Sequence, residues 1–163
     1  MTSFLLAMNE IEPGLFLSGI IAANNRDLVM SKGINSIVSV ISDATIGNKH
    51  PDINYYTIRI DDLPMENITV HIPGAIKFIH QEMTRGKRVL VHCAAGISRS
   101  SSIMVAYFMA KYNESFDEAL ARVRRGRPVA WPNQGFETQL RRLDINFLRS
   151  CLTNGLEISV RSS

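Results

Sequence analysis

The 163-residue sequence contains only two cysteines, Cys93 and Cys151, and no Cys-x-x-Cys pair. Two cysteines cannot build the disulfide framework of a small secreted domain, and their scarcity favours a reducing compartment. The four histidines do not occur at metal-ligand spacings, so a metal site is the least favoured function class. We therefore expect a chain that folds through its hydrophobic core and works without a metal or another cofactor.

Long apolar runs and a strong charge excess are also missing. No segment approaches the ~18 apolar residues that cross a membrane. The 18 basic and 15 acidic residues leave a net charge of only +3, which suits an anionic substrate without demanding nucleic acid. The amino end lacks the basic start of a secretory signal, Thr2 replaces the glycine that myristoylation requires, and the carboxyl end lacks a prenylation cysteine. We expect no membrane anchor, no nucleic-acid partner, and a cytoplasmic or also nuclear location.

The composition that is present is typical of a globular chain, with 45% hydrophobic and 20% charged residues. A chain of this length usually forms one domain and buries roughly 70% of the surface that its unfolded form exposes. The hydrophobic pattern continues to about residue 149 without a repeat or a linker. We predict a single domain over residues 1–163, with its core at about 10–149 and an amino-terminal arm that is either docked or frayed.

Short apolar runs alternate with amphipathic patterns. The runs that predict strands are 15–17, 34–41, 55–60 and 89–91. The patterns that predict helices are 22–31, 72–85, 100–111, 115–125 and 134–149. This alternation predicts an α/β fold with a mostly parallel central sheet of about five strands flanked by helices. Ligands of such sheets bind at the carboxyl ends of strands, which directs attention to the loop after Val91.

That loop has the sequence His92-Cys93-Ala94-Ala95-Gly96-Ile97-Ser98-Arg99-Ser100. Its backbone N–H groups have no strand partner, so they can curl around one centre at the start of the next helix and form an anion site. Gly96 permits the tight curvature, and Arg99 adds a planar fork of donors that matches two phosphate oxygens. The expected phosphate-binding residues are Ala94, Ala95, Gly96, Ile97, Ser98 and Arg99.

Cys93 lies in the middle of this positive field. Thiols near helix N-termini and cations have pKa values of ~3.5–7.5, against ~8.5 for a free cysteine. We therefore expect an ionised Cys93 that attacks a phosphorus held by the loop, while the N–H groups and Arg99 stabilise the transition state. A lone cysteine after a buried strand is more often a small apolar residue, but the glycine and arginine that follow favour catalysis. His92 is expected to hold the loop through hydrogen bonds.

The segment His92-Cys93-x-x-Gly96-x-x-Arg99-Ser100 resembles the signature of the cysteine-dependent protein phosphatases. Two further segments resemble elements of the dual-specificity branch, Ala106-Tyr107-Phe108-Met109 and Pro132-Asn133-Gln134-Gly135-Phe136. The resemblance implies a small, catalytic-domain-only phosphatase with a cysteine-phosphatase-like fold. It implies dephosphorylation through a cysteinyl-phosphate without metal, with Ser100 helping to release the thiolate and Asn133 bracing the phosphate loop.

A general acid that protonates the leaving oxygen is worth typically ~10²–10⁴ in rate. The strand at 55–60 ends in Asp61-Asp62-Leu63-Pro64, and the carboxyl ends of parallel strands share one rim, so this loop could overhang Cys93. Two aspartates at a strand end also fit simple turn chemistry. The resemblance places the acid in the second acidic position of the motif, which is Asp62, with Asp61 as the alternative.

The short chain leaves little room for the extra loops that give tyrosine-specific phosphatases a deep slot. A shallower pocket is expected to accept phosphotyrosine, phosphoserine and phosphothreonine in a phosphorylated protein, for which a signalling kinase is a family-level candidate. The variable loop positions carry no lysine, which disfavours a lipid or RNA phosphate. A phospho-ligand binding module without turnover and a sulfur-transferring rhodanese-type protein remain as alternatives. The sequence does not determine the oligomeric state.

Three further features have two interpretations each. The run from Arg122 to Arg127 complements a helix dipole or forms a docking patch for acidic partners. Trp131 belongs to the core or to a pocket wall. Cys151 is an inert thiol or a partner for an oxidised Cys93.

Overall fold

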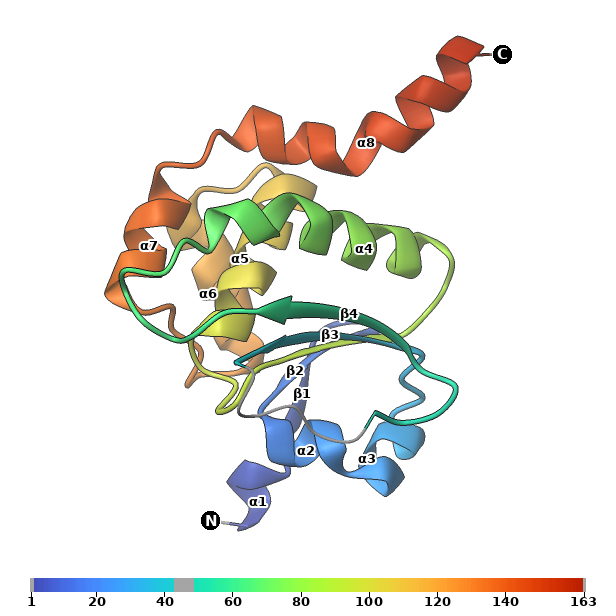
Figure 1. Cartoon of the computed structure of the whole chain (residues 1–163), viewed down its shortest axis with the longest axis vertical. Coiled ribbons are helices and arrows are strands. Elements are labelled where there is room, and N and C mark those ends of the chain that lie inside the picture. Colours follow the sequence, from blue (N-terminus) through green and yellow to red (C-terminus); the bar gives the residue numbers. More distant parts are fainter. Residues whose placement is uncertain (1, 43–48, 163) are drawn as a thin grey trace.

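The computed structural model describes residues 2–42 and 49–162, with side chains for 4–42 and 49–153. Five strands form one sheet in the order β1-β2-β5-β3-β4 (Figure 1). The strands are β1 (Met8–Glu12), β2 (Leu15–Ser18), β3 (Ser36–Ile41), β4 (Asn54–Arg59) and β5 (Val89–His92). The edge strand β1 is antiparallel to β2, and the other neighbouring pairs are parallel. The predicted mostly parallel α/β sheet is therefore confirmed.

Helices cover both faces of the sheet (Figure 1). One face carries α2 (Ile20–Asn24) and α3 (Arg26–Ser31), with α1 (Thr2–Leu5) beside them. The elements on the other side are η2 (Thr69–His71), α4 (Ile72–Thr84), α5 (Arg99–Tyr112), α6 (Phe116–Gly126), α7 (Gln134–Arg141) and α8 (Ile145–Ser162). This layering leaves the carboxyl ends of the parallel strands along one rim of the sheet.

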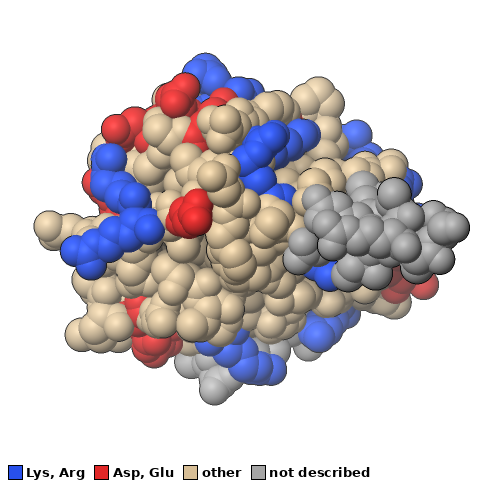
Figure 2. Space-filling view, turned by 90° about the horizontal axis from the view of Figure 1, so that it is seen from above, with Lys and Arg blue, Asp and Glu red and all other residues tan. Residues whose placement is uncertain are grey.

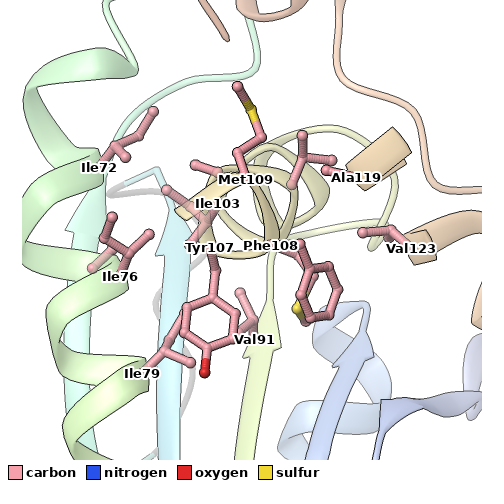
Figure 3. Close-up of a cluster of buried hydrophobic side chains, with 14 of the residues drawn as sticks. Ile72, Ile76, Ile79, Val91, Ile103, Tyr107, Phe108, Met109, Ala119 and Val123 are labelled. Carbon is pink, nitrogen blue, oxygen red and sulfur yellow. The ribbon is translucent and has the colours of Figure 1, made fainter. Parts of the chain in front are cut away.

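The core has two parts because strand side chains alternate between the two faces of the sheet. Leu15, Leu17 and Val91 belong to the larger cluster, while Phe16 and Leu90 belong to the smaller one under α2 and α3. Helix α5 is buried along its length from Arg99 to Ala110, in agreement with its apolar residues on more than one face. Figure 3 shows α5 side chains packed between those of α4 and those of α6. This packing fixes the start of α5 beneath the end of β5.

Two expected helices are each two helices in the structure. The predicted helix at 134–149 is interrupted after α7, because the Asp144 carboxylate accepts the Asn146 N–H and starts α8 as a cap. The predicted helix at 22–31 is divided at Asn25, whose side chain accepts the Leu28 N–H at the start of α3. The capping box of Ser115 and Glu118 is present as predicted.

The amino-terminal arm is docked on the domain rather than frayed. Its residues form α1 and the edge strand β1, and Met8 is only 6% exposed. The buried core therefore runs from Met8 to Cys151. Among the described residues, none of the helices has the length and hydropathy of a membrane span. On the face seen in Figure 2, basic and acidic side chains are interspersed on a mostly uncharged surface.

Candidate active site

The site is formed by the loop that connects β5 to α5. Strand β5 ends at His92, so Cys93 is the first residue of the loop, and Arg99 is the first residue of the helix. His92 is level with Ser18 of β2 and Ser39 of β3 in the parallel register. The ends of these strands therefore meet at one rim, as the sequence predicted.

The loop turns its carbonyl groups outward, toward the surrounding protein. Ala94 O accepts from Ile20 N at 2.9 Å, and Ile97 O accepts from Trp131 N at 2.8 Å. The Arg127 guanidinium donates to Ala95 O at 3.2 Å and to Gly96 O at 2.8 Å. Because C=O and N–H point in opposite directions across a trans peptide bond, outward carbonyls direct the amides toward the centre of the loop. The anion cradle expected at 94–99 has this geometry.

Gly96 is required by this curvature. Its φ is +70°, a left-handed conformation that side chains other than glycine rarely adopt. An added Cβ would lie 2.6 Å from the Ser18 carbonyl carbon and 2.7 Å from Gly19 N. Both the backbone angle and the contact with the end of β2 therefore exclude a larger residue.

Cys93 and Ser100 meet inside the loop. The Cys93 Sγ lies 3.1 Å from the Ser100 Oγ, and the two residues are 2% and 0% exposed. A hydroxyl at this distance can donate to a thiolate and stabilise its charge. Ser100, which the resemblance associates with release of the thiolate, therefore lies within hydrogen-bonding distance of the sulfur.

Arg99 is held in place by the backbone that follows β4. Its Nη1 donates to Ile60 O at 3.0 Å, just after β4. The side chain is 7% exposed, and its Nε is a buried donor without a hydrogen-bond partner in the described protein. A buried donor at this place is suited to an oxyanion oxygen, because leaving it unpaired is costly. Arg99 therefore has one side of its guanidinium anchored and the other available.

His92, the last residue of β5, has a hydrogen-bond partner at each ring nitrogen. Its Nδ1 lies 3.1 Å from Cys93 O, and its Nε2 lies 2.8 Å from Ser39 Oγ. A carbonyl oxygen only accepts, so Nδ1 carries the proton and the neutral Nε2 accepts from Ser39. Burial lowers the pKa of His92 to about 4, with a smaller contribution from the nearby Arg99 charge. A neutral imidazole with hydrogen bonds at both ring nitrogens suits a positioning role.

Asp62 is connected to the loop through Asn133. The Asn133 Nδ2 donates to Asp62 Oδ1 at 2.9 Å, while its backbone N–H donates to Ser98 Oγ at 2.8 Å. The Asn133 Oδ1 also accepts from Phe136 N, so Asn133 caps α7 and contacts the phosphate loop as well. Asp61 instead lines a separate surface cavity with Arg59 and Glu66. The geometry thus favours Asp62 over Asp61 as the acid.

The acid loop is clamped from α7. The Gln139 side chain accepts from Ile68 N at 2.9 Å and donates to Glu66 O at 2.8 Å. A Cβ on Gly135 would lie 2.0 Å from Pro64 O, so the start of α7 touches the loop directly. The position of Asp62 is therefore set by contacts with α7 and the segment before it.

Comparison with known proteins identifies the family. A family model described as the dual specificity phosphatase catalytic domain matches residues 15–146. The chain belongs to the dual specificity phosphatases. It is a hydrolase that removes phosphate from phosphoproteins, in agreement with the resemblance of its loop.

Several relatives match this phosphatase over most of its length. Dual specificity protein phosphatase 1B of Arabidopsis thaliana is 36% identical over 138 residues, which are 84% of this chain and 81% of the relative. Human dual specificity protein phosphatase 22 is 36% identical over 137 residues, which are 84% of this chain and 73% of the relative. The crystal structure of DUSP15 has a TM-score of 0.83 at 33% identity and covers 90% of this chain and 95% of that one. The sequence relatives and the solved structure therefore indicate the same family.

Arg127 is a residue of this phosphatase that sequence reasoning did not single out. It is 2% exposed, and in addition to the two loop carbonyls it donates to Asn9 Oδ1 at 2.7 Å and to Ala7 O at 3.4 Å. Burial lowers the pKa of its guanidinium, and the negative charge of nearby Cys93 partly counters this. The arginine run was a visible signal, but it did not show which arginine turns inward.

Two other arginines of the run also have partners inside the protein. Arg122 pairs with the Glu114 carboxylate, and the Arg124 guanidinium lies 4.7 Å from the centroid of the Trp131 ring. Trp131 is 49% exposed, so it is not a core residue, and its backbone N–H donates to Ile97 O of the loop. Burial raises the pKa of the Cys151 thiol, which favours the inert interpretation.

Proposed function

We propose that this dual specificity phosphatase works through a cysteinyl-phosphate on Cys93. The Cys93 thiolate attacks the phosphorus, a sulfur–phosphorus bond forms, and the bond to the leaving oxygen breaks. Asp62 donates a proton to that oxygen, so the product leaves as a neutral alcohol or phenol. The amides of residues 94–99 and the Arg99 guanidinium bind the equatorial oxygens, whose charge they stabilise in the transition state.

The second step returns the enzyme to its starting state. Water attacks the phosphorus, the Asp62 carboxylate accepts its proton, and inorganic phosphate is released as the sulfur–phosphorus bond breaks. The Ser100 hydroxyl, 3.1 Å from the sulfur, donates to the departing thiolate. The observation that carries this proposal is the ring of outward-facing carbonyls around a cysteine that has a hydroxyl donor beside it.

The proposal extends to the substrate and the setting of the reaction. The exposure of the acid loop at 61–65 supports a shallow site that accepts phosphoserine and phosphothreonine besides phosphotyrosine. We propose that its substrate is a phosphorylated signalling kinase, on the basis of the family. We also propose a cytoplasmic or also nuclear location, on the basis of the composition. In this proposal, residues 1–163 form one catalytic domain. The reaction proceeds without a metal ion.

An aryl phosphate assay tests the mechanism. The wild type should hydrolyse p-nitrophenyl phosphate in the presence of a metal chelator. Cys93→Ser should abolish turnover while still binding vanadate, because the amides and Arg99 remain. Cys151→Ser is the matched control and should retain activity. Turnover by Cys93→Ser at the wild-type rate would remove Cys93 from the mechanism, and a chelator-sensitive wild type would require a metal.

A further inference from the structure

A second cavity opens beside the phosphate loop. Its volume is about 300 Å³, and Arg127 contributes to its walls together with residues from three segments. These are Phe4 and Leu5 of α1, Gly19 and Ile21 at the start of α2, and Ala94 and Ala95 of the loop. Phe4, Leu5 and Ile21 are 43%, 51% and 51% exposed. Three large apolar side chains thus face solvent at one place next to the catalytic loop.

The cavity and the phosphate site share a wall. Ala94 and Ala95 belong to the curled loop and also line the cavity, and the Ile20 N–H bond to Ala94 O fixes α2 against that half of the loop. The other half of the loop accepts hydrogen bonds from the backbone N–H groups of Trp131 and Asn133. The segment that contacts the acid loop thus lies beside one half of the phosphate loop, and the apolar cavity lies beside the other half.

Arg127 does not convert the cavity into an anion site. Four of its N–H donors are already bound, to Gly96 O, Ala95 O, Ala7 O and Asn9 Oδ1. The Phe4 ring also lies 5.5 Å from the guanidinium carbon. A second phosphate would have to displace these contacts, whereas an apolar side chain would leave them intact. The chemistry of the walls therefore selects an apolar occupant.

We propose that this cavity binds an apolar side chain of the substrate, close in sequence to the phosphorylated residue. The proposal rests on the function above, because it requires the phosphate to occupy the loop at 94–99. Substrate selection would then combine two neighbouring sites, one for the phosphate and one for a leucine- or isoleucine-like side chain. Loss of such a contact typically changes kcat/KM by about tenfold or more.

A peptide series measures this preference. Phosphotyrosine is placed in a glycine and serine background, and one leucine is moved through the nearby positions on both sides. For each peptide, kcat/KM is divided by that for p-nitrophenyl phosphate, which is too small to reach the cavity. We expect about a tenfold gain at one position or at two adjoining ones. Ile21→Ser should remove the gain, and Met30→Ser, an exposed apolar residue on α3, should keep it.

The outcomes separate the cavity from the mechanism. No leucine preference, a preference that Ile21→Ser leaves intact, or a gain from glutamate at the favoured position would overturn the proposal. Dimerisation that Ile21→Ser abolishes would assign the cavity to a second copy and would also overturn it. If p-nitrophenyl phosphate is not hydrolysed, the catalytic mechanism fails. The leucine preference in peptide binding to Cys93→Ser would then still decide whether the cavity takes an apolar side chain.

Discussion

The phosphate loop follows β5 and the acid loop follows β4 in the same sheet, yet the two loops are held in different ways. Cys93 and Arg99 are 2% and 7% exposed, and the carbonyls around them are bound by β5, α2 and Arg127. Asp62 lies in an exposed stretch that is held by side chains of Asn133 and Gln139. The position of the nucleophile is thus part of the core, whereas the position of the acid depends on a few surface hydrogen bonds.

Arg99→Lys attacks the buried half of this comparison. Lysine keeps the charge but lacks the planar fork, so it cannot hold Ile60 O and two phosphate oxygens together. We expect kcat/KM for p-nitrophenyl phosphate to fall by about 10³–10⁵. Arg125→Lys, at an exposed position of α6, is the control and should keep wild-type activity. A loss smaller than tenfold would mean that Arg99 does not contact the phosphoryl group.

Asp62→Ala attacks the exposed half. It should lower kcat/KM by about 10²–10⁴ for phenyl phosphate, whose leaving group needs a proton, and far less for p-nitrophenyl phosphate. The alkaline limb of the pH–rate profile should flatten, because an acid that loses its proton at high pH has been removed. Asp61→Ala provides the comparison at the adjacent carboxylate. If Asp61→Ala gives the larger, leaving-group-dependent loss, the assignment of the acid is wrong.

His92 links the buried half to pH. The pKa of the His92 imidazole falls from its ordinary 6.5 to about 4 in the folded protein. At pH 5 this imidazole is therefore protonated in the unfolded chain and neutral in the folded chain. The contribution to stability is therefore present above pH 6.5 and is lost as the pH falls toward 4. Between pH 7 and pH 5, the free energy of unfolding should drop by about 2 kcal/mol more in the wild type than in His92→Asn. Urea unfolding at both pH values measures the difference, and an equal drop in both proteins contradicts the prediction.

Gln139→Ala is expected to give the smallest effect of these variants, and it tests how the acid loop is held. It removes the two hydrogen bonds that clamp the acid loop, so kcat for phenyl phosphate should fall by about tenfold through misplacement of Asp62. The effect should vanish in an Asp62→Ala background, because both changes act on the same step. Gln134→Ala on the same helix is the control. Additive losses in the double variant would show that Gln139 acts independently of the acid.

The same contrast explains what the sequence could reveal. The phosphate loop is local, because Cys93, Gly96 and Arg99 lie within one turn between a strand and a helix, so spacing alone indicated its chemistry. The contacts of Arg127 depend on the edge strand β1, whose polar Asn9 and Glu10 gave it no clear strand pattern. A side chain that serves a distant backbone leaves no periodic signal.

The acid site was only partly accessible to sequence reasoning. The strand end before Asp61 and Asp62 was visible, but the choice between the two depends on Asn133, which is far away in the chain. The break between α7 and α8 was missed because the apolar spacing continues across it, while the cap formed by Asp144 is a local polar interaction. Periodicity therefore located the elements, and individual hydrogen bonds decided their ends and the site.

The bonds from Arg127 to Ala7 and Asn9 have a practical consequence for anyone handling this enzyme. Trimming the amino end past Asn9 removes two hydrogen-bond acceptors of the side chain that holds the catalytic loop. Catalytic rates obtained from differently prepared proteins would then disagree, even though every catalytic group is intact.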